Sequence, residues 1–158
     1  MLITARANSG DDMHRGVVGH ATSTDMDRWE VQPPLSTPVN DFAHLEVFQV
    51  VTIGAQTYLI FCCDTPRLSG KLKGQMGGTW WARAQGPAGP FDIGGAKLLA
   101  PQDLYAGRLV QDRAGQWNLM AFDNRIIDGD FAGAIIDPIR VVMDRVSGEL
   151  SLLPRMAA

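Results

Sequence analysis

The stretch FAHLEVFQVVTIGAQTYLIFCC (residues 42–63) contains two short apolar segments separated by a glycine-containing turn at residues 54–56. Neither segment has the periodicity of an amphipathic helix, and the second is led by an aromatic residue, as in a β-hairpin. Similar short apolar segments run through the whole chain between its 17 glycines and 9 prolines. The frequent glycines and prolines between short apolar segments predict an all-β protein without long helices.

These segments recur along the chain at a nearly constant spacing. Leu59–Cys63 aligns with Leu2–Arg6 and with Leu119–Asp123, at steps of roughly 60 residues. Gly16–Ala21 aligns in the same way with Gly78–Arg83. A period of this length that holds about four strands is typical of one blade of a β-propeller. The sequence therefore predicts an incomplete β-propeller of four-stranded antiparallel blades.

The repeat also gives the predicted domain organisation, a single truncated propeller domain over residues 1–158. Residues 1–35 form a partial blade, 42–98 and 103–140 form two further blades, and 141–154 form terminal strands. The first segment, which begins at Leu2, is assigned to the third strand of its blade. The alternative is an irregular β-sandwich, which the repeated turn followed by an aromatic residue disfavours.

Composition limits the classes of function. A chain of 158 residues with 46% apolar and 20% charged residues can bury one core. Its net charge of −3 leaves no basic stripe for nucleic acid. No apolar run approaches the roughly 20 residues of a membrane span, and the N-terminal segment is too short for the apolar region of a signal peptide. We therefore expect no nucleic-acid or membrane partner, and a cytoplasmic location.

Cysteine and histidine give no metal-binding pattern. Cys62 and Cys63 are adjacent, which disfavours a disulfide between them and offers no ligand spacing. His14, His20 and His44 are scattered without an i, i+4 pair. The sequence thus predicts no metal site and no cofactor.

Glu46 is the leading candidate for a functional residue. It is the one carboxylate in the apolar segment 42–52, and an unpaired carboxylate is costly to bury. If each blade begins with the strand before the glycine turn, Glu46 lies on a first strand. First strands of propellers line the central channel, where ligands bind. The alternative places Glu46 on the solvent side of an edge strand.

Three blocks of the sequence carry a family resemblance. They are His20–Met26 followed by Trp29, Leu45-Glu46-Val47, and Leu104-Tyr105-Ala106. In that order they resemble the S-x-D-L-x-x-W, E-C-P and Y-A blocks of glycoside hydrolase family 32, the β-fructosidases (invertases, inulinases and levanases). The likeness covers nearly the whole chain and is closest to shorter bacterial members, whose glutamate block resembles L-E-V-P-Q-V.

The resemblance implies a five-bladed propeller, of which this chain holds about three blades. It also implies retaining hydrolysis of terminal β-fructofuranosides such as sucrose, inulin and levan, with Glu46 as the general acid/base. Retaining enzymes need a second, nucleophilic carboxylate about 5–5.5 Å away. The family supplies it from an N-D-P-N-G-like motif, and a stabilising aspartate from an R-D-P motif. Neither motif occurs here, because the chain starts too late to include them. Asp137-Pro138 resembles R-D-P, but Ile136 replaces the arginine, and Phe48 stands where the family usually has proline. We therefore expect the chain alone to be inactive.

Four further residues are candidates for substrate binding: Tyr105, Asp103, Trp80 and His20. Tyr105 and Asp103 open the next inner strand, although a buried tyrosine with a satisfied hydroxyl is an equal alternative. Trp80 and Trp81 are adjacent on a strand, so they point to opposite faces. One ring is expected in the core, and the other could stack on a sugar. His20 opens the first of the three family-like blocks.

Two interpretations compete with a fructosidase fragment that binds a fructoside. An open propeller exposes strand edges and apolar faces, so the chain could be a non-catalytic module that binds sugar or forms homo-oligomers through blade edges. It could also be the product of a truncated gene with no selected function.

Overall fold

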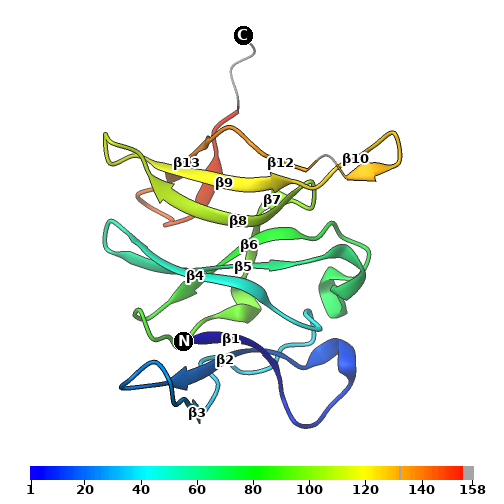
Figure 1. The fold of residues 1–158 in the computed structure, drawn as a ribbon, viewed down its shortest axis with the longest axis vertical. Helices are drawn as coiled ribbons and strands as arrows, with labels where there is room; N and C mark the ends of the chain where they lie inside the picture. Colours follow the sequence, from blue (N-terminus) through cyan, green and yellow to red (C-terminus); the bar gives the residue numbers. More distant parts are fainter. Residues whose placement is uncertain (132, 155–158) are drawn as a thin grey trace.

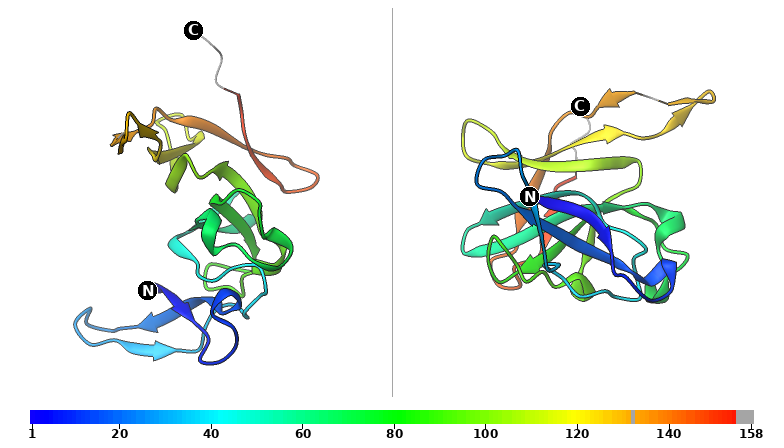
Figure 2. Two further views of the ribbon diagram at one scale, coloured as in Figure 1. Left: turned by 90° about the vertical axis from the view of Figure 1, so that its right-hand side faces the viewer. Right: turned by 60° about the horizontal axis from the view of Figure 1, so that its bottom comes forward.

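The computed structural model describes residues 1–131 and 133–154. They form three larger antiparallel sheets in successive layers and one separate two-stranded sheet (Figures 1 and 2). The helical elements of these residues are 3-10 turns of three residues each: η1 (Asp12–His14), η2 (Thr65–Arg67), η3 (Gly70–Leu72) and η4 (Ile93–Gly95). The all-β prediction is confirmed. No helix in the described part of the chain is long and apolar enough to cross a membrane.

The first two sheets are simple meanders. The sheet that holds the N-terminus contains β1 (Leu2–Arg6), β2 (Gly16–Thr22) and β3 (Glu30–Gln32), in that order. The middle sheet contains β4 (Glu46–Ile53), β5 (Gln56–Cys63), β6 (Gly78–Ala84) and β7 (Lys97–Pro101), again in chain order. All neighbouring strands are antiparallel, as expected for propeller blades.

The third sheet follows the same plan with an interrupted third strand. Its strands are β8 (Leu104–Gln111), β9 (Trp117–Asp123), β12 (Ala134–Ile135), β13 (Ile139–Met143) and β14 (Leu150–Leu152). β12 and β13 pair with successive parts of β9, and β14 pairs with β13. The predicted boundary after residue 140 thus falls inside β13. The short hairpin of β10 (Ile126–Ile127) and β11 (Asp130–Phe131) projects from this sheet (Figure 1).

The repeat seen in the sequence corresponds to equivalent strands. β1 and β5 each pair with the next strand of the chain, β2 or β6, and each packs against the first strand of the next sheet, β4 or β8. β9 is likewise the second strand of its sheet, where it lies between β8 on one side and β12 and β13 on the other. β1 is therefore the second strand of its blade, and its assignment to the third strand was wrong. The reason is that β1 pairs with β2, the counterpart of β6.

The middle sheet is covered on both faces. Tyr58 and Ile60 of β5 pack into a core shared with the third sheet, whereas Leu59 and Phe61 pack into a core shared with the first sheet. Because successive side chains of a strand point to opposite faces, a strand buried on both faces has a continuous apolar sequence. This explains why residues 58–63 contain no charged side chain.

A side-chain amide joins the middle and third sheets. Gln49 in β4 donates from Nε2 to the carbonyl oxygen of Leu109 at 2.8 Å, and its Oε1 accepts the Leu109 backbone N–H, also at 2.8 Å. Leu109 is buried in β8, away from water. The amide therefore satisfies two backbone groups that would otherwise lack partners.

Replacing Gln49 with alanine is expected to lower the free energy of unfolding by about 1–3 kcal/mol, because it leaves buried backbone groups of Leu109 unpaired. Urea unfolding followed by tryptophan fluorescence measures this change. Gln85→Ala, at an exposed position directly after β6, is the control and should change stability by less than about 0.5 kcal/mol. Equal stabilities of the two variants would rule out the proposed role of the Gln49 amide.

Candidate functional site

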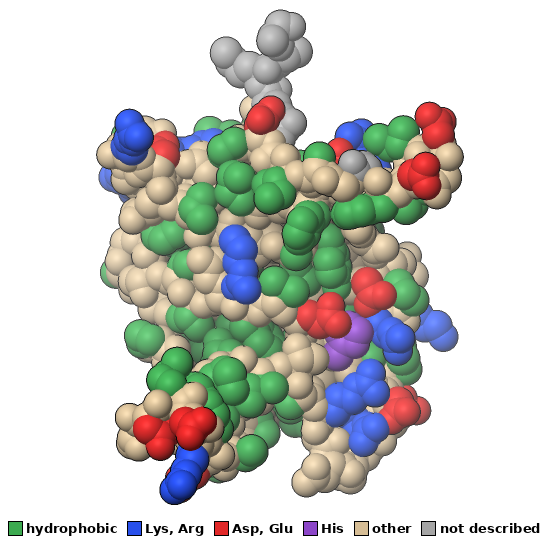
Figure 3. All heavy atoms as spheres, in the orientation of Figure 1, with side chains coloured by type: hydrophobic (Ala, Val, Ile, Leu, Met, Phe, Trp, Pro, Cys, Tyr) green, Lys and Arg blue, Asp and Glu red, His purple; other side chains and the backbone are tan. Residues whose placement is uncertain are grey.

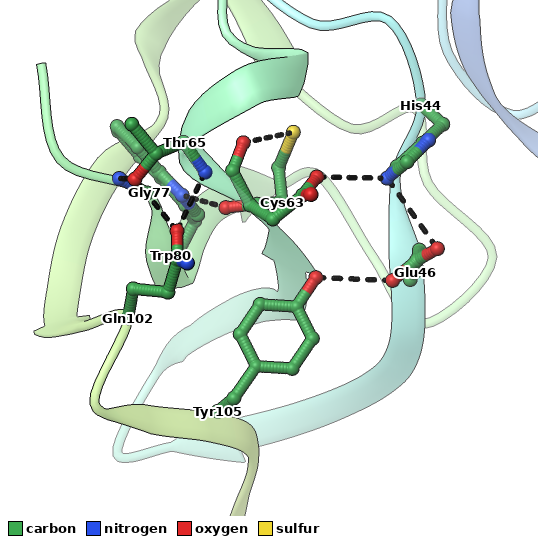
Figure 4. A network of polar contacts seen from close by, with 9 residues as sticks. His44, Glu46, Cys63, Thr65, Gly77, Trp80, Gln102 and Tyr105 are labelled. Atoms are coloured by element: carbon green, nitrogen blue, oxygen red, sulfur yellow. Dashed lines mark hydrogen bonds and ion pairs between the residues drawn. The ribbon is translucent and has the colours of Figure 1, made fainter. Parts of the chain in front are cut away.

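The carboxylate of Glu46 lies among three polar side chains at the start of β4 (Figure 4). The Tyr105 hydroxyl donates a hydrogen bond to Glu46 Oε2 at 3.0 Å. His44 Nε2 lies 3.4 Å from Glu46 Oε1 and 3.5 Å from Oδ1 of Asp64. The site thus combines residues from the segment before β4, the end of β5 and the start of β8.

A bulge follows each of the two strand residues of this site. The pairing register shifts after Glu46 in β4 and after Tyr105 in β8. Val47 has a φ of 55° and Ala106 a φ of 53°, both in the left-handed region. That conformation is a genuine outlier for a β-branched valine and costs on the order of 1–3 kcal/mol. Bulges re-aim side chains, and here the two bulged strands bring the Glu46 and Tyr105 side chains together (Figure 4).

These residues line an open cavity of about 410 Å³. Its lining comprises His44, Glu46, Asp64, Arg67, Gln102, Tyr105 and Asn124. The Glu46 side chain is 37% exposed, so its carboxylate can be reached from solvent. In Figure 3 a histidine side chain lies among acidic and basic side chains on the face toward the viewer. The cavity is therefore polar and can accept a hydrophilic ligand.

Burial and charge keep the hydroxyl and thiol groups of the site protonated. Burial raises the pKa of Tyr105, and the adjacent Glu46 carboxylate raises it further. Burial, together with the Asp64 carboxylate, raises the pKa of Cys63 to about 12. Tyr105 is consequently a stable hydrogen-bond donor to Glu46 across the physiological pH range.

The structure unites only one of the four predicted binding residues with Glu46, namely Tyr105. Asp103 is exposed and lines a neighbouring cavity that contains Asp123 and Arg125 but not Glu46. His20 is half-buried in β2 and does not line the cavity of Glu46.

Trp80 is placed in the core. Its side chain is 3% exposed, it packs edge-to-face against Phe42, and its Nε1–H donates to the carbonyl oxygen of Cys63. Trp81 points to the opposite face, as expected, but is only 2% exposed. Because sheets cover both faces of β6, neither ring has a free surface for a sugar, and the stacking prediction for Trp80 is wrong.

His44 and Asp64 belong to this site but were not predicted as site residues from the sequence. His44 was considered only for the i, i+4 spacing of a helix, whereas residues i and i+2 of an extended chain share a face. The segment His44-Leu45-Glu46 has that spacing. Asp64 lies directly after β5, and its proximity depends on the pairing of Glu46 with Cys62 across the hairpin. The pairing of Glu46 with Cys62 depends on the bulge between Glu46 and Gln49, which the sequence pattern does not reveal.

The fold is similar to two solved structures of glycoside hydrolases, although no family model and no curated protein matches the sequence. The glycoside hydrolase family 32 protein from Bifidobacterium adolescentis superposes with a TM-score of 0.59 at 13% identity, over 88% of this chain and 24% of that chain. The exo-β-1,3-galactanase from Phanerochaete chrysosporium, solved with β-1,3-galactotriose, superposes with a TM-score of 0.50 at 16% identity, over 84% of this chain and 36% of that one.

This chain thus spans about a quarter to a third of the length of these structures. At such low identities the similarity defines the fold alone. The chain has the fold of an incomplete β-propeller, similar to part of these two structures, which confirms the predicted fold class.

Tyr105→Phe is expected to reduce the loss of stability at alkaline pH. The folded protein retains the Tyr105 proton at a pH where the unfolded chain, with a tyrosine pKa near 10, releases it. The contribution of this group to stability is therefore complete below about pH 10 and falls above it by about 1.4 kcal/mol per pH unit. Urea unfolding between about pH 10 and 11.5 compares the two slopes. Identical slopes would show that the pKa of Tyr105 is not raised by folding.

Proposed function

We propose that this chain is the part of a β-propeller glycoside hydrolase that carries the general acid/base, Glu46, and that the substrates are terminal β-fructofuranosides. The position of Glu46 is the observation that supports this function. Glu46 lies at the start of the first strand of a complete blade, in an open polar cavity, with one oxygen held by Tyr105. A general acid needs such access to the leaving oxygen together with a fixed orientation.

The substrate class rests on the block around Glu46 rather than on the block that ends at Trp29. In the latter, Ser23 Oγ accepts the Met26 N–H at 2.8 Å, and Asp25 Oδ1 accepts the backbone N–H groups of Asp27 and Arg28. These bonds form a self-contained turn, and they hold the pKa of Asp25 below its usual value. Ser23 and Asp25 therefore have a structural role in this turn that does not require a sugar.

Among the described residues, the cavity does not hold the opposing carboxylate of a retaining pair. Asp64 is the only other carboxylate of residues 1–131 and 133–154 that lines it. Its Oδ1 and Glu46 Oε1 approach the same nitrogen of His44, so the imidazole lies between the two carboxylates. A glycosidic bond cannot occupy that space, whereas a retaining mechanism requires the two carboxylates to flank it. Turnover therefore needs a nucleophile from outside this cavity's lining.

The chain is expected to bind a fructo-oligosaccharide without hydrolysing it. Isothermal titration calorimetry with the full chain measures binding, and reducing-sugar release from sucrose and inulin measures turnover. Glu46→Gln should weaken binding several-fold, because a charged acceptor for sugar hydroxyls is lost. Glu30→Gln, an exposed carboxylate on β3, should leave binding unchanged.

Two results would refute parts of this proposal. Hydrolysis by the chain alone that is lost in Glu46→Gln would show that the nucleophile lies within it. Tighter binding of β-1,3-galactotriose than of the fructo-oligosaccharide would overturn the fructoside assignment but leave the glycosidase assignment intact.

A self-associating module is the second candidate function, and an exposed apolar surface favours it. Five large apolar side chains of the third sheet and its hairpin are between 46% and 67% exposed. They are Phe122, Ile126, Ile127, Phe131 and Ile135. Large exposed apolar patches in proteins mark sites of association, and a neighbouring blade or a second copy of the chain would cover this one.

If this apolar surface mediates association, the chain forms a defined oligomer at micromolar concentration, as measured by light scattering. Phe122→Glu with Ile135→Glu should then yield a monomer, because burying two carboxylates in an apolar contact is unfavourable. Val146→Glu, in the exposed turn before β14, is the control and should leave the oligomer intact. A monomeric wild-type chain would exclude this candidate function.

A further inference from the structure

Three side chains with metal-ligating atoms lie close together beside the Glu46 cavity. The ligand atoms of His44, Cys63 and Asp64 all lie within 4.8 Å of one another. Cys63 and Asp64 are adjacent at the end of β5, and the hairpin of β4 and β5 places them next to the segment that contains His44. Glu46 Oε1 lies 3.4 Å from His44 Nε2 but is not part of this group.

Two of these atoms, His44 Nε2 and Asp64 Oδ1, are buried without a hydrogen-bond partner in the part of the chain that the structure describes. Buried polar atoms of native proteins nearly always have partners, so each exception needs an explanation. The two atoms are 3.5 Å apart, beyond the usual 2.7–3.2 Å of an N–H···O hydrogen bond. A ligand that contacts both atoms would satisfy them together.

The spacing of the three atoms is compatible with the ligand shell of a small tetrahedral cation. Zinc bonds to histidine nitrogen and carboxylate oxygen of about 2.0–2.2 Å place neighbouring ligand atoms about 3.3–3.5 Å apart. His44 Nε2 lies 3.5 Å from the Asp64 oxygen, and Cys63 Sγ lies within 4.8 Å of both atoms. The mixed donor set of imidazole, thiol and carboxylate also suits Zn²⁺, whereas Ca²⁺ and Mg²⁺ prefer oxygen alone.

We propose that His44, Cys63 and Asp64 bind a Zn²⁺ ion, with a water molecule completing the tetrahedral shell. The Cys63 thiol releases its proton to solvent as the Zn–S bond forms. This site goes beyond the proposed glycosidase function, because none of its three ligands is the proposed acid/base.

Titration of the chelator-treated full chain with Zn²⁺ tests the proposal, with isothermal calorimetry and competition against a chromogenic chelator as readouts. One ion per chain is expected to bind. His44→Ala and Asp64→Asn should each weaken binding at least about tenfold, since even outer-shell partners of a metal contribute 10–100-fold. Ca²⁺ at the same concentrations should not bind measurably.

Cobalt substitution identifies the sulfur ligand independently of affinity. The Co²⁺-loaded chain should show a thiolate-to-cobalt charge-transfer absorption that Cys63→Ser removes. Cys62→Ser is the matched control, because the Cys62 thiol contacts Thr79 instead. The absorption should persist in that variant.

Several outcomes would overturn the proposal: no saturable Zn²⁺ binding by the wild-type chain, unchanged affinity in both Asp64→Asn and Cys63→Ser, or tighter binding of Ca²⁺ than of Zn²⁺. If circular dichroism shows that His44→Ala does not fold, the affinities of the other variants and the cobalt spectrum test whether the site binds zinc.

Discussion

Burial of β5 on both faces is the constraint from which the rest of the structure follows. Its residues alternate between two cores, so the first and third sheets must both pack against the middle sheet. Because the middle sheet packs between the other two, the third sheet is held close to the start of β4. Tyr105 of β8 can then reach across the sheets to Glu46, and Gln49 can bond to the backbone of Leu109. The candidate site is thus a product of packing between blades.

The bulges after Glu46 and Tyr105 persist because neighbouring contacts hold them. In β8, the Gly107 N–H donates to Thr79 Oγ1 at 3.2 Å, while the Thr79 hydroxyl donates to the carbonyl oxygen of Leu104. A side chain at Gly107 would meet Thr79 Oγ1 at 2.5 Å, so glycine is required there. In β4, the Gln49 amide anchors the strand immediately after its bulge. The left-handed backbone at Val47 is therefore imposed by packing, and it serves to orient the glutamate.

Sequence reasoning predicted the parts of this structure that depend on local pattern. The repeat predicted the blades, and the position of the glycine turn predicted that Glu46 lies on a first strand. Trp80 and Trp81 were correctly assigned to opposite faces, but alternation along a strand does not reveal whether one face or both are covered. Likewise, His44 and Asp64 join the site through cross-strand pairing and a bulge. Such features depend on register between segments and leave little trace in a single sequence.

The proposed zinc site and the proposed acid/base meet at the His44 side chain. Tyr105 donates to Glu46 Oε2, and His44 Nε2 faces both Glu46 Oε1 and Asp64 Oδ1. In the zinc-bound form, His44 Nε2 is a ligand of the metal, so it cannot also contact Glu46 Oε1. A general acid depends on a fixed orientation of its carboxyl group. Occupancy of the zinc site therefore changes how Glu46 is held, although the metal does not bind Glu46.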